Sequence, residues 1–127
     1  MSTDWELEDW LLEAGETAER KALTGRPLTA IEALIREFWV FDVQTQNGGV
    51  SQYFCNYPSR WEILRTASGS KSAPALEAIV AEVNRVIAGS SDPYSAALAA
   101  SPYLEQHYEK HQLEALRELR RLAKVEQ

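Results

Sequence analysis

Three carboxamide side chains lie in an otherwise strongly aromatic stretch of the chain, residues 38–56, with the sequence FWVFDVQTQNGGVSQYFCN. Asn47, Gln52 and Asn56 could line a small polar pocket for a ligand or peptide, because amides both donate and accept hydrogen bonds. They could also cap helix ends and satisfy backbone groups at a buried corner, which requires no ligand. We favour this structural interpretation, under which Asn47→Ala mainly lowers thermal stability.

Two histidines and the single cysteine are the other residues that could do chemistry. His107 and His111 are spaced i, i+4, which can direct two imidazoles at one metal ion, but the residues between them do not form an HExxH motif. We expect a solvated helix face and no metal. Cys55 has no nearby base in the sequence to lower its pKa, so we predict a buried, inert thiol. No P-loop, Rossmann or Gly-x-Ser-x-Gly pattern occurs, and we predict no catalytic residue and no cofactor.

Length and composition are those of a single globular domain. The chain has 127 residues, of which 45% are hydrophobic and 25% charged, enough for one continuous core. One cysteine cannot form an internal disulfide, which favours a reducing compartment. The acidic start does not resemble a signal peptide, and no stretch approaches the roughly 20 apolar residues of a membrane span. We therefore expect a cytoplasmic protein.

The negative charge is concentrated at the start of the chain. The net charge is −6, yet residues 1–19 contain seven acidic residues and no Lys or Arg. Such a protein is not attracted non-specifically to nucleic acid. The acidic segment is either a solvated helix face or a contact surface for a basic partner. The residues that would make this contact are Asp4, Glu6, Glu8, Asp9, Glu13 and Glu16.

Apolar spacing predicts helices throughout the first half of the chain. A first, acidic helix lies within residues 1–23, with Asp4 as its cap and an apolar stripe containing Trp5 and Trp10 that should dock onto the core. Thr29 and Glu32 form a capping box that starts the central helix. Gly48-Gly49 reads as a helix-to-helix corner, followed by a short helix that ends before Pro58.

The second half continues with helices that begin at capping residues. Ser59 is the expected cap of a helix in which Trp61, Ile63 and Leu64 are apolar positions, and Ser72 precedes a helix that starts at Pro74. Asp92-Pro93 opens a short helix over 94–100, and Ser101-Pro102 a long last one. The fold class is therefore all-α. We predict one domain of six to seven helices over residues 1–127, with an acidic helix at 1–23 and a core at 28–124.

The corner also carries a resemblance to a known family. The run Phe41-x-Val43-x3-Asn47-Gly48-Gly49-Val50-x-Gln52-Tyr53-Phe54-x-Asn56 resembles the signature of the bacterial DNA-mimic protein family, with Val50 where that family more often has Phe. The resemblance extends over residues 28–120. The resemblance implies an all-helical domain. For the member that gives the family its name, it also implies carboxylates that are arranged like the phosphates of DNA and presented to a DNA-binding transcription factor.

These observations lead to one principal hypothesis and two alternatives. The principal one is a non-enzymatic interaction module whose acidic first helix contacts a basic partner such as a DNA-binding protein. The first alternative is a ligand-binding or enzymatic domain with a pocket formed by Asn47, Gly48, Gly49, Gln52, Tyr53 and Asn56. The second is an immunity-type inhibitor of a toxin or an enzyme. The leucines of the last helix lack a sustained heptad spacing, so no oligomeric state is predicted.

Overall fold

The computed structural model describes residues 4–69 and 71–126, and within these ranges every regular element is helical. The α-helices are α1 (Asp4–Leu23), α2 (Ala30–Gly48), α3 (Val50–Asn56), α4 (Trp61–Gly69), α5 (Pro74–Ile87), α6 (Pro93–Ala99) and α7 (Tyr103–Glu126), and a 3-10 turn covers Pro58–Arg60. The all-α prediction is confirmed. No described helix is both long and apolar enough to cross a bilayer.

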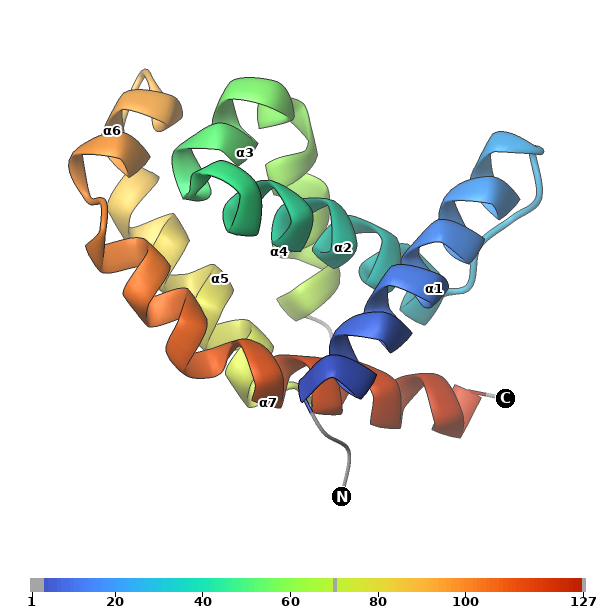
Figure 1. Ribbon diagram of the computed structural model, residues 1–127. Helices are drawn as coiled ribbons and strands as arrows, with labels where there is room; N and C mark the ends of the chain where they lie inside the picture. The colour runs from blue at the N-terminus through green and yellow to red at the C-terminus, as the bar shows by residue number, and fades with distance from the viewer. Residues whose placement is uncertain (1–3, 70, 127) are drawn as a thin grey trace.

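Helix α2 is the central element of the fold. It packs against α1, α3, α4 and α7. Helix α7 also lies side by side with α5 (Figure 1). Helix α1 crosses α2 and also reaches α7. Phe41 of α2 lies at the middle of an aromatic cluster, with its ring centroid 5.0 Å from that of Tyr53 and 5.6 Å from that of Tyr108, both edge to face. Such tilted contacts are the arrangement that aromatic rings prefer.

Carboxylates from α7 close the amino-terminal ends of other helices. Glu118 is buried and accepts hydrogen bonds from the backbone N–H groups of Ala75 and Leu76 at 2.8 and 3.0 Å. Glu105 likewise accepts from the N–H of Val50 at 2.9 Å. These groups need acceptors, and a negative charge there complements the helix dipole. The expected cap at Ser72 was wrong, because the cap residue of α5 is Ala73, without a side-chain hydrogen bond, and Glu118 supplies the acceptor.

The predicted apolar positions are only partly buried. On α1 the buried stripe comprises Leu7, Leu11, Gly15 and Ala18. Trp10 packs partly buried against the core, but Trp5 is 67% exposed, so the prediction that both tryptophans dock was wrong for Trp5. Ile63 is 53% exposed, because it points away from the face of α4 that carries Trp61 and Leu64. Isolated solvent-facing apolar residues such as these are ordinary for a small protein.

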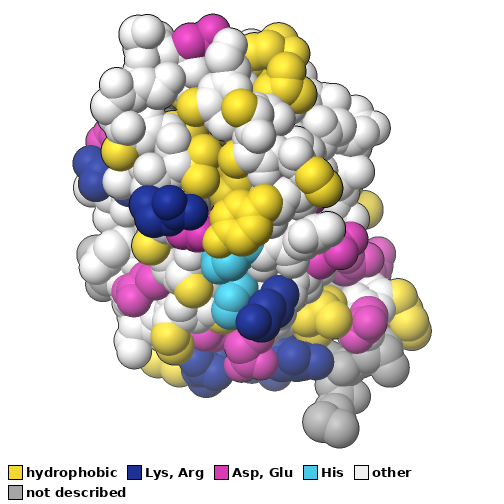
Figure 2. Space-filling view, turned by 90° about the vertical axis from the view of Figure 1, so that its left-hand side faces the viewer, with side chains coloured by type: hydrophobic (Ala, Val, Ile, Leu, Met, Phe, Trp, Pro, Cys, Tyr) yellow, Lys and Arg dark blue, Asp and Glu magenta, His cyan; other side chains and the backbone are white. Residues whose placement is uncertain are grey.

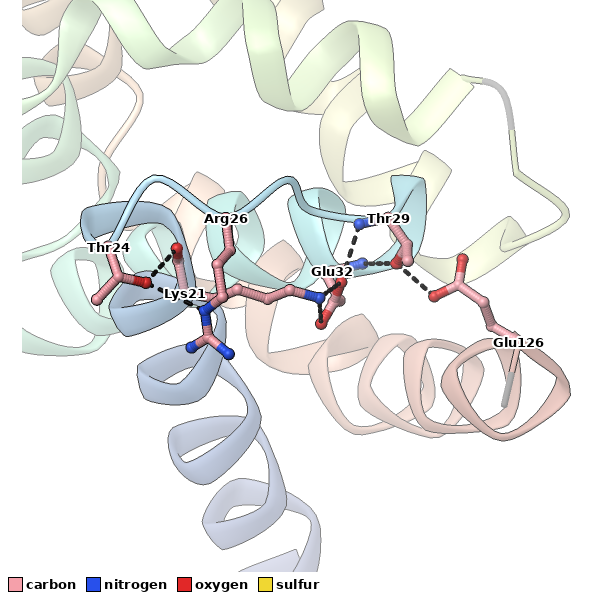
Figure 3. Close-up of polar contacts among 6 residues, drawn as sticks. All are labelled: Lys21, Thr24, Arg26, Thr29, Glu32 and Glu126. Carbon is pink, nitrogen blue, oxygen red and sulfur yellow. Dashed lines mark hydrogen bonds and ion pairs between the residues drawn. The ribbon is translucent and has the colours of Figure 1, made fainter.

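Polar contacts fix the connection between α1 and α2 (Figure 3). The capping box is present, with Thr29 and Glu32 each accepting from the other's backbone N–H. Lys21 near the end of α1 bonds the same Glu32 carboxylate at 2.8 Å, and the Thr29 hydroxyl donates to Glu126 at the end of α7. A second ion pair joins Arg36 of α2 to Glu19 of α1 at 2.6 Å. The acidic helix is therefore held in place at its carboxyl-terminal half.

Candidate functional site

Four of the acidic residues in α1 form a continuous column on its solvent side. Glu6, Asp9, Glu13 and Glu16 are separated by three, four and three residues, which places them on one face of a helix. All four are exposed. At about 1.5 Å of rise per residue the column is about 15 Å long. Asp4 and Glu8, also expected to contact a partner, lie elsewhere around the helix, so the six predicted residues do not form one surface.

Three of the four column residues are not neutralised by an ion pair with any residue that the structure describes. Elsewhere in the molecule Lys or Arg neutralises many of the carboxylates, in pairs that include Glu37–Arg60, Glu62–Arg65, Glu82–Arg85 and Glu114–Arg117. Among the described residues, Asp9, Glu13 and Glu16 form no ion pair. Arg120 of α7 borders the column, since it lines a shallow groove together with Glu6, Asp9 and Glu13. Asp9, Glu13 and Glu16 therefore leave uncompensated negative charge on the solvent side of α1.

The Gly-Gly corner has the predicted form. Gly49 adopts a φ of 86°, which favours glycine, and its N–H donates to the carbonyl oxygen of Thr45 at 2.9 Å. The next N–H, that of Val50, is the one that Glu105 accepts. A β-carbon on Gly49 would lie 3.2 Å from the Glu105 carboxylate. Glycine therefore permits both the turn and the close approach of α7.

The carboxamides at the corner do not converge on a common pocket. Gln52 and Asn56 both donate to the side-chain oxygen of Gln44, at 3.0 and 2.7 Å. Asn47 is exposed and makes no side-chain hydrogen bond among the described residues, so the expectation that its amide caps the helix was wrong. Gln44, which joins the other two amides, was missed because its partners lie eight and twelve positions along the chain.

Tyr53 and Cys55, two further residues of this stretch, do not lie where the sequence interpretation put them. Tyr53 is fully buried among aromatic rings, and burial raises the pKa of its hydroxyl far above the ordinary value. Cys55 is exposed, so the prediction of a buried thiol was wrong. The physical reason is the helical period: Tyr53 and Phe54 of the short helix α3 face the core, and the next position turns to solvent.

On its other side, the corner borders an open groove of about 470 Å³ between α1, α2 and α7, here called the corner groove. Its acidic lining residues are Glu8, Glu105 and Glu109. The remainder of the lining is polar or glycine apart from the Tyr108 ring, and consists of Thr45, Gln46, Asn47, Gly48, Gly49, Tyr108 and Gln112. The predicted pocket residues Asn47, Gly48 and Gly49 therefore line a concave surface, while Gln52, Tyr53 and Asn56 are absent from this lining.

Three lining residues of this groove donate hydrogen bonds to one buried carboxylate. Asp42 of α2 accepts hydrogen bonds from the Tyr108 hydroxyl and from the amides of Gln112 and Gln46, the amides at 3.0 Å. Gln112 also donates to Glu8 at 3.1 Å. Burial raises the pKa of Asp42, and the nearby Glu8 charge adds to that rise. Sequence reasoning missed this network, because Asp42 and Tyr108 are 66 residues apart.

The two histidines lie on a different face, beside exposed apolar side chains (Figure 2). Their ring centroids are 4.7 Å apart. Neighbouring Tyr103 donates a hydrogen bond to Glu82, and hydrogen bonding to Arg85 lowers the pKa of Glu82 to about 2. No group of three or more His, Cys, Asp or Glu side chains that could hold a metal ion occurs in the parts of the chain that the structure describes.

The fold and the acidic column together define an all-α protein with one strongly negative helix face. A family model for DMP19-like proteins matches residues 26–124, and the chain therefore belongs to the DMP19-like family. The family takes its name from DNA mimic protein 19. This agrees with the resemblance seen at the Gly-Gly corner. No curated protein and no solved structure matched the chain. The matched residues contain eleven acidic and eleven Lys or Arg side chains, so the negative charge lies almost entirely outside them, mainly in α1.

Proposed function

We propose that this protein binds a basic, DNA-binding protein and that the exposed carboxylates of α1 take the place of DNA phosphates in that complex. The observation that carries the proposal is the column of Glu6, Asp9, Glu13 and Glu16. Its four charges are spaced by about 5 Å along the helix, compared with about 3.4 Å along one strand of DNA. Membership of the DMP19-like family supports the same partner class.

The rigidity of α1 favours this use of its surface. The ion pairs Lys21–Glu32 and Arg36–Glu19 tie α1 to α2, and Leu7 and Leu11 are buried in the core. A partner would therefore not have to order the acidic residues' backbone when it binds, and this lowers the entropic cost of association. The near neutrality of residues 26–124 supports α1 rather than the rest of the domain as the phosphate substitute.

Competition with DNA tests the proposal directly. The full chain is immobilised, proteins from the source organism are captured and identified, and duplex DNA is then added at increasing concentration. We expect the captured partner to be a DNA-binding protein that duplex DNA displaces, with binding that weakens as salt is raised, because exposed charges are screened. Capture that neither duplex DNA nor salt reduces would contradict the proposal.

A matched pair of variants locates the surface. The test variant neutralises three column residues, by Asp9→Asn, Glu13→Gln and Glu16→Gln. The control neutralises three exposed acids on other helices, by Glu62→Gln, Glu77→Gln and Glu114→Gln. Both change the net charge equally, so a general charge effect weakens both alike. We expect the test variant to lose the partner and the control to retain it; the reverse result would remove α1 from the interface.

A further inference from the structure

We infer that the corner groove is a second binding site, and that it takes an alkylguanidinium or alkylammonium group. The acidic residues that line it come from two helices: Glu8 from α1, and Glu105 and Glu109 from α7. No Lys or Arg is found in its described lining. Glu8 and Glu109 form no ion pair with any residue that the structure describes. The groove is thus a concave surface of one sign of charge, which concentrates cations.

A buried carboxylate that is bonded to the lining adds to this negative potential. Tyr108 and Gln112 line the groove, and both donate to Asp42 of α2. Asp42 is buried and has no Lys or Arg among its hydrogen-bond partners in the described structure. A cation in the groove would interact with this carboxylate through a medium of lower dielectric than water, where attraction is stronger.

Thr45 supplies an independent sign of a missing partner. It lines the groove and is only 6% exposed, yet its hydroxyl oxygen has no hydrogen-bond partner among the residues that the structure describes. Buried polar groups are rarely left unpaired in native proteins. The charged lining residues Glu8, Glu105 and Glu109 are carboxylates, which only accept, so a ligand that supplies only donors is the complementary one. Guanidinium and ammonium groups have donors and no acceptor.

The shape and grouping of the acids favour an organic cation over a metal ion. The described part of the chain has no cluster of three or more side chains that could hold a metal. The groove volume of about 470 Å³ lies within the ~300–1,000 Å³ of small-molecule sites. Gly48 and Gly49 are part of the lining and add no side chain to it. An arginine side chain of a protein and a free amine share this chemistry, and the experiment below separates them.

This site does not depend on the proposed binding of a DNA-binding protein. The column residues that would replace DNA phosphates lie on a different side of α1 from Glu8, the residue of α1 that lines the groove. The triple column variant therefore leaves every residue of the groove unchanged. Small probes can therefore be titrated into the purified protein without the partner. Failure of the groove and failure of the column would appear in different experiments.

The test follows the backbone amide signals of Gly48 and Gly49 by NMR while three probes are titrated at low salt. The probes are the capped tripeptide Gly-Arg-Gly, the same peptide with neutral citrulline in place of arginine, and agmatine. We expect saturable shifts with the two charged probes and none with citrulline. Tighter binding of the peptide would assign the site to a protein's arginine, and equal or tighter binding of agmatine to a free amine. Absent shifts, or equal shifts with citrulline, would overturn the inference.

Variants show which residues hold the probe. Glu109→Gln should weaken the affinity for the charged probes about fivefold, as expected for a partly exposed ion pair. Glu8→Gln should have a similar effect. Glu114→Gln on the same helix is the control and should leave the affinity within about twofold. Thr45→Val replaces the hydroxyl by a methyl group of similar size and should also weaken binding. Equal affinities for wild type, Glu8→Gln and Glu109→Gln would show that the charge attraction is not at this groove.

Discussion

The backbone of Gly15 in α1 lies directly against the indole ring of Trp39 in α2. A β-carbon at position 15 would be 2.3 Å from Cγ of Trp39, closer than any non-bonded contact allows. Gly15 is also one of the four buried positions of α1. This contact sets how closely the acidic helix approaches the central helix.

Gly15→Ala should therefore destabilise the protein, although alanine is the better helix former. Overpacking costs about 1–3 kcal/mol, and the gain in helix propensity offsets about 1 kcal/mol of it. We expect a net loss of about 1 kcal/mol in the free energy of unfolding, measured by urea denaturation. Gly69→Ala is the control, since a β-carbon there meets no atom of another described part of the chain within 4 Å. A Gly15→Ala protein as stable as wild type would show that Trp39 moves aside freely.

Glu118→Ala should be among the more damaging single substitutions in α7. It removes the buried acceptor of two backbone N–H groups at the start of α5 and leaves both unpaired. Unpaired buried donors cost about 1–3 kcal/mol each at most, so we expect a loss of about 2–4 kcal/mol in the free energy of unfolding. The exposed Glu114→Ala should change it by less than about 0.5 kcal/mol. Similar losses for the two variants would refute the capping role.

The raised pKa of Asp42 predicts a particular pH dependence of stability. Burial disfavours its charged form in the folded protein, so the folded pKa lies above the unfolded value of 3.8. A raised folded pKa contributes stability below the unfolded value, and this contribution is lost as pH rises through the folded pKa. Asp42→Asn cannot titrate. The stability of wild type relative to Asp42→Asn should accordingly fall as pH rises above about 4.

Chemical denaturation of both proteins at a series of pH values measures this difference. Other titrating groups, including nearby Glu8, are common to both proteins and cancel to first order. The stability of wild type relative to Asp42→Asn could instead stay constant or increase as pH rises. Either result would mean that the hydrogen bonds from Tyr108 and the amides affect the pKa of Asp42 at least as strongly as burial of its charge does.

Cys55 should react with a thiol reagent in the native protein, because its side chain is exposed. We expect one equivalent of thiol to be modified without denaturant, at a rate close to that in urea. The Cys55→Ser variant, which has no other cysteine, is the blank for this measurement. Protection of the native thiol by more than about tenfold would contradict the exposed position.

The sequence by itself determined the helices and the corner between them. The Thr29–Glu32 capping box, Asp92 as the cap of α6 and Pro74 at the start of α5 act on groups within a few residues, so their effects can be read from spacing. The same holds for Gly49, whose positive φ is a local property of glycine.

Tertiary structure decided which polar groups meet. Asp42 and Tyr108, Glu118 and Ala75, and Gln44 and Asn56 are pairs brought together by packing, and no local pattern marks them. The exposure of Cys55 and Trp5 follows from how short helices and helix ends are oriented against the core. Local spacing gives the faces of each helix, but only the packed molecule decides which face is covered. The acidic column of α1 was visible as charge in the sequence, and became a surface only once Leu7 and Leu11 fixed the opposite side in the core.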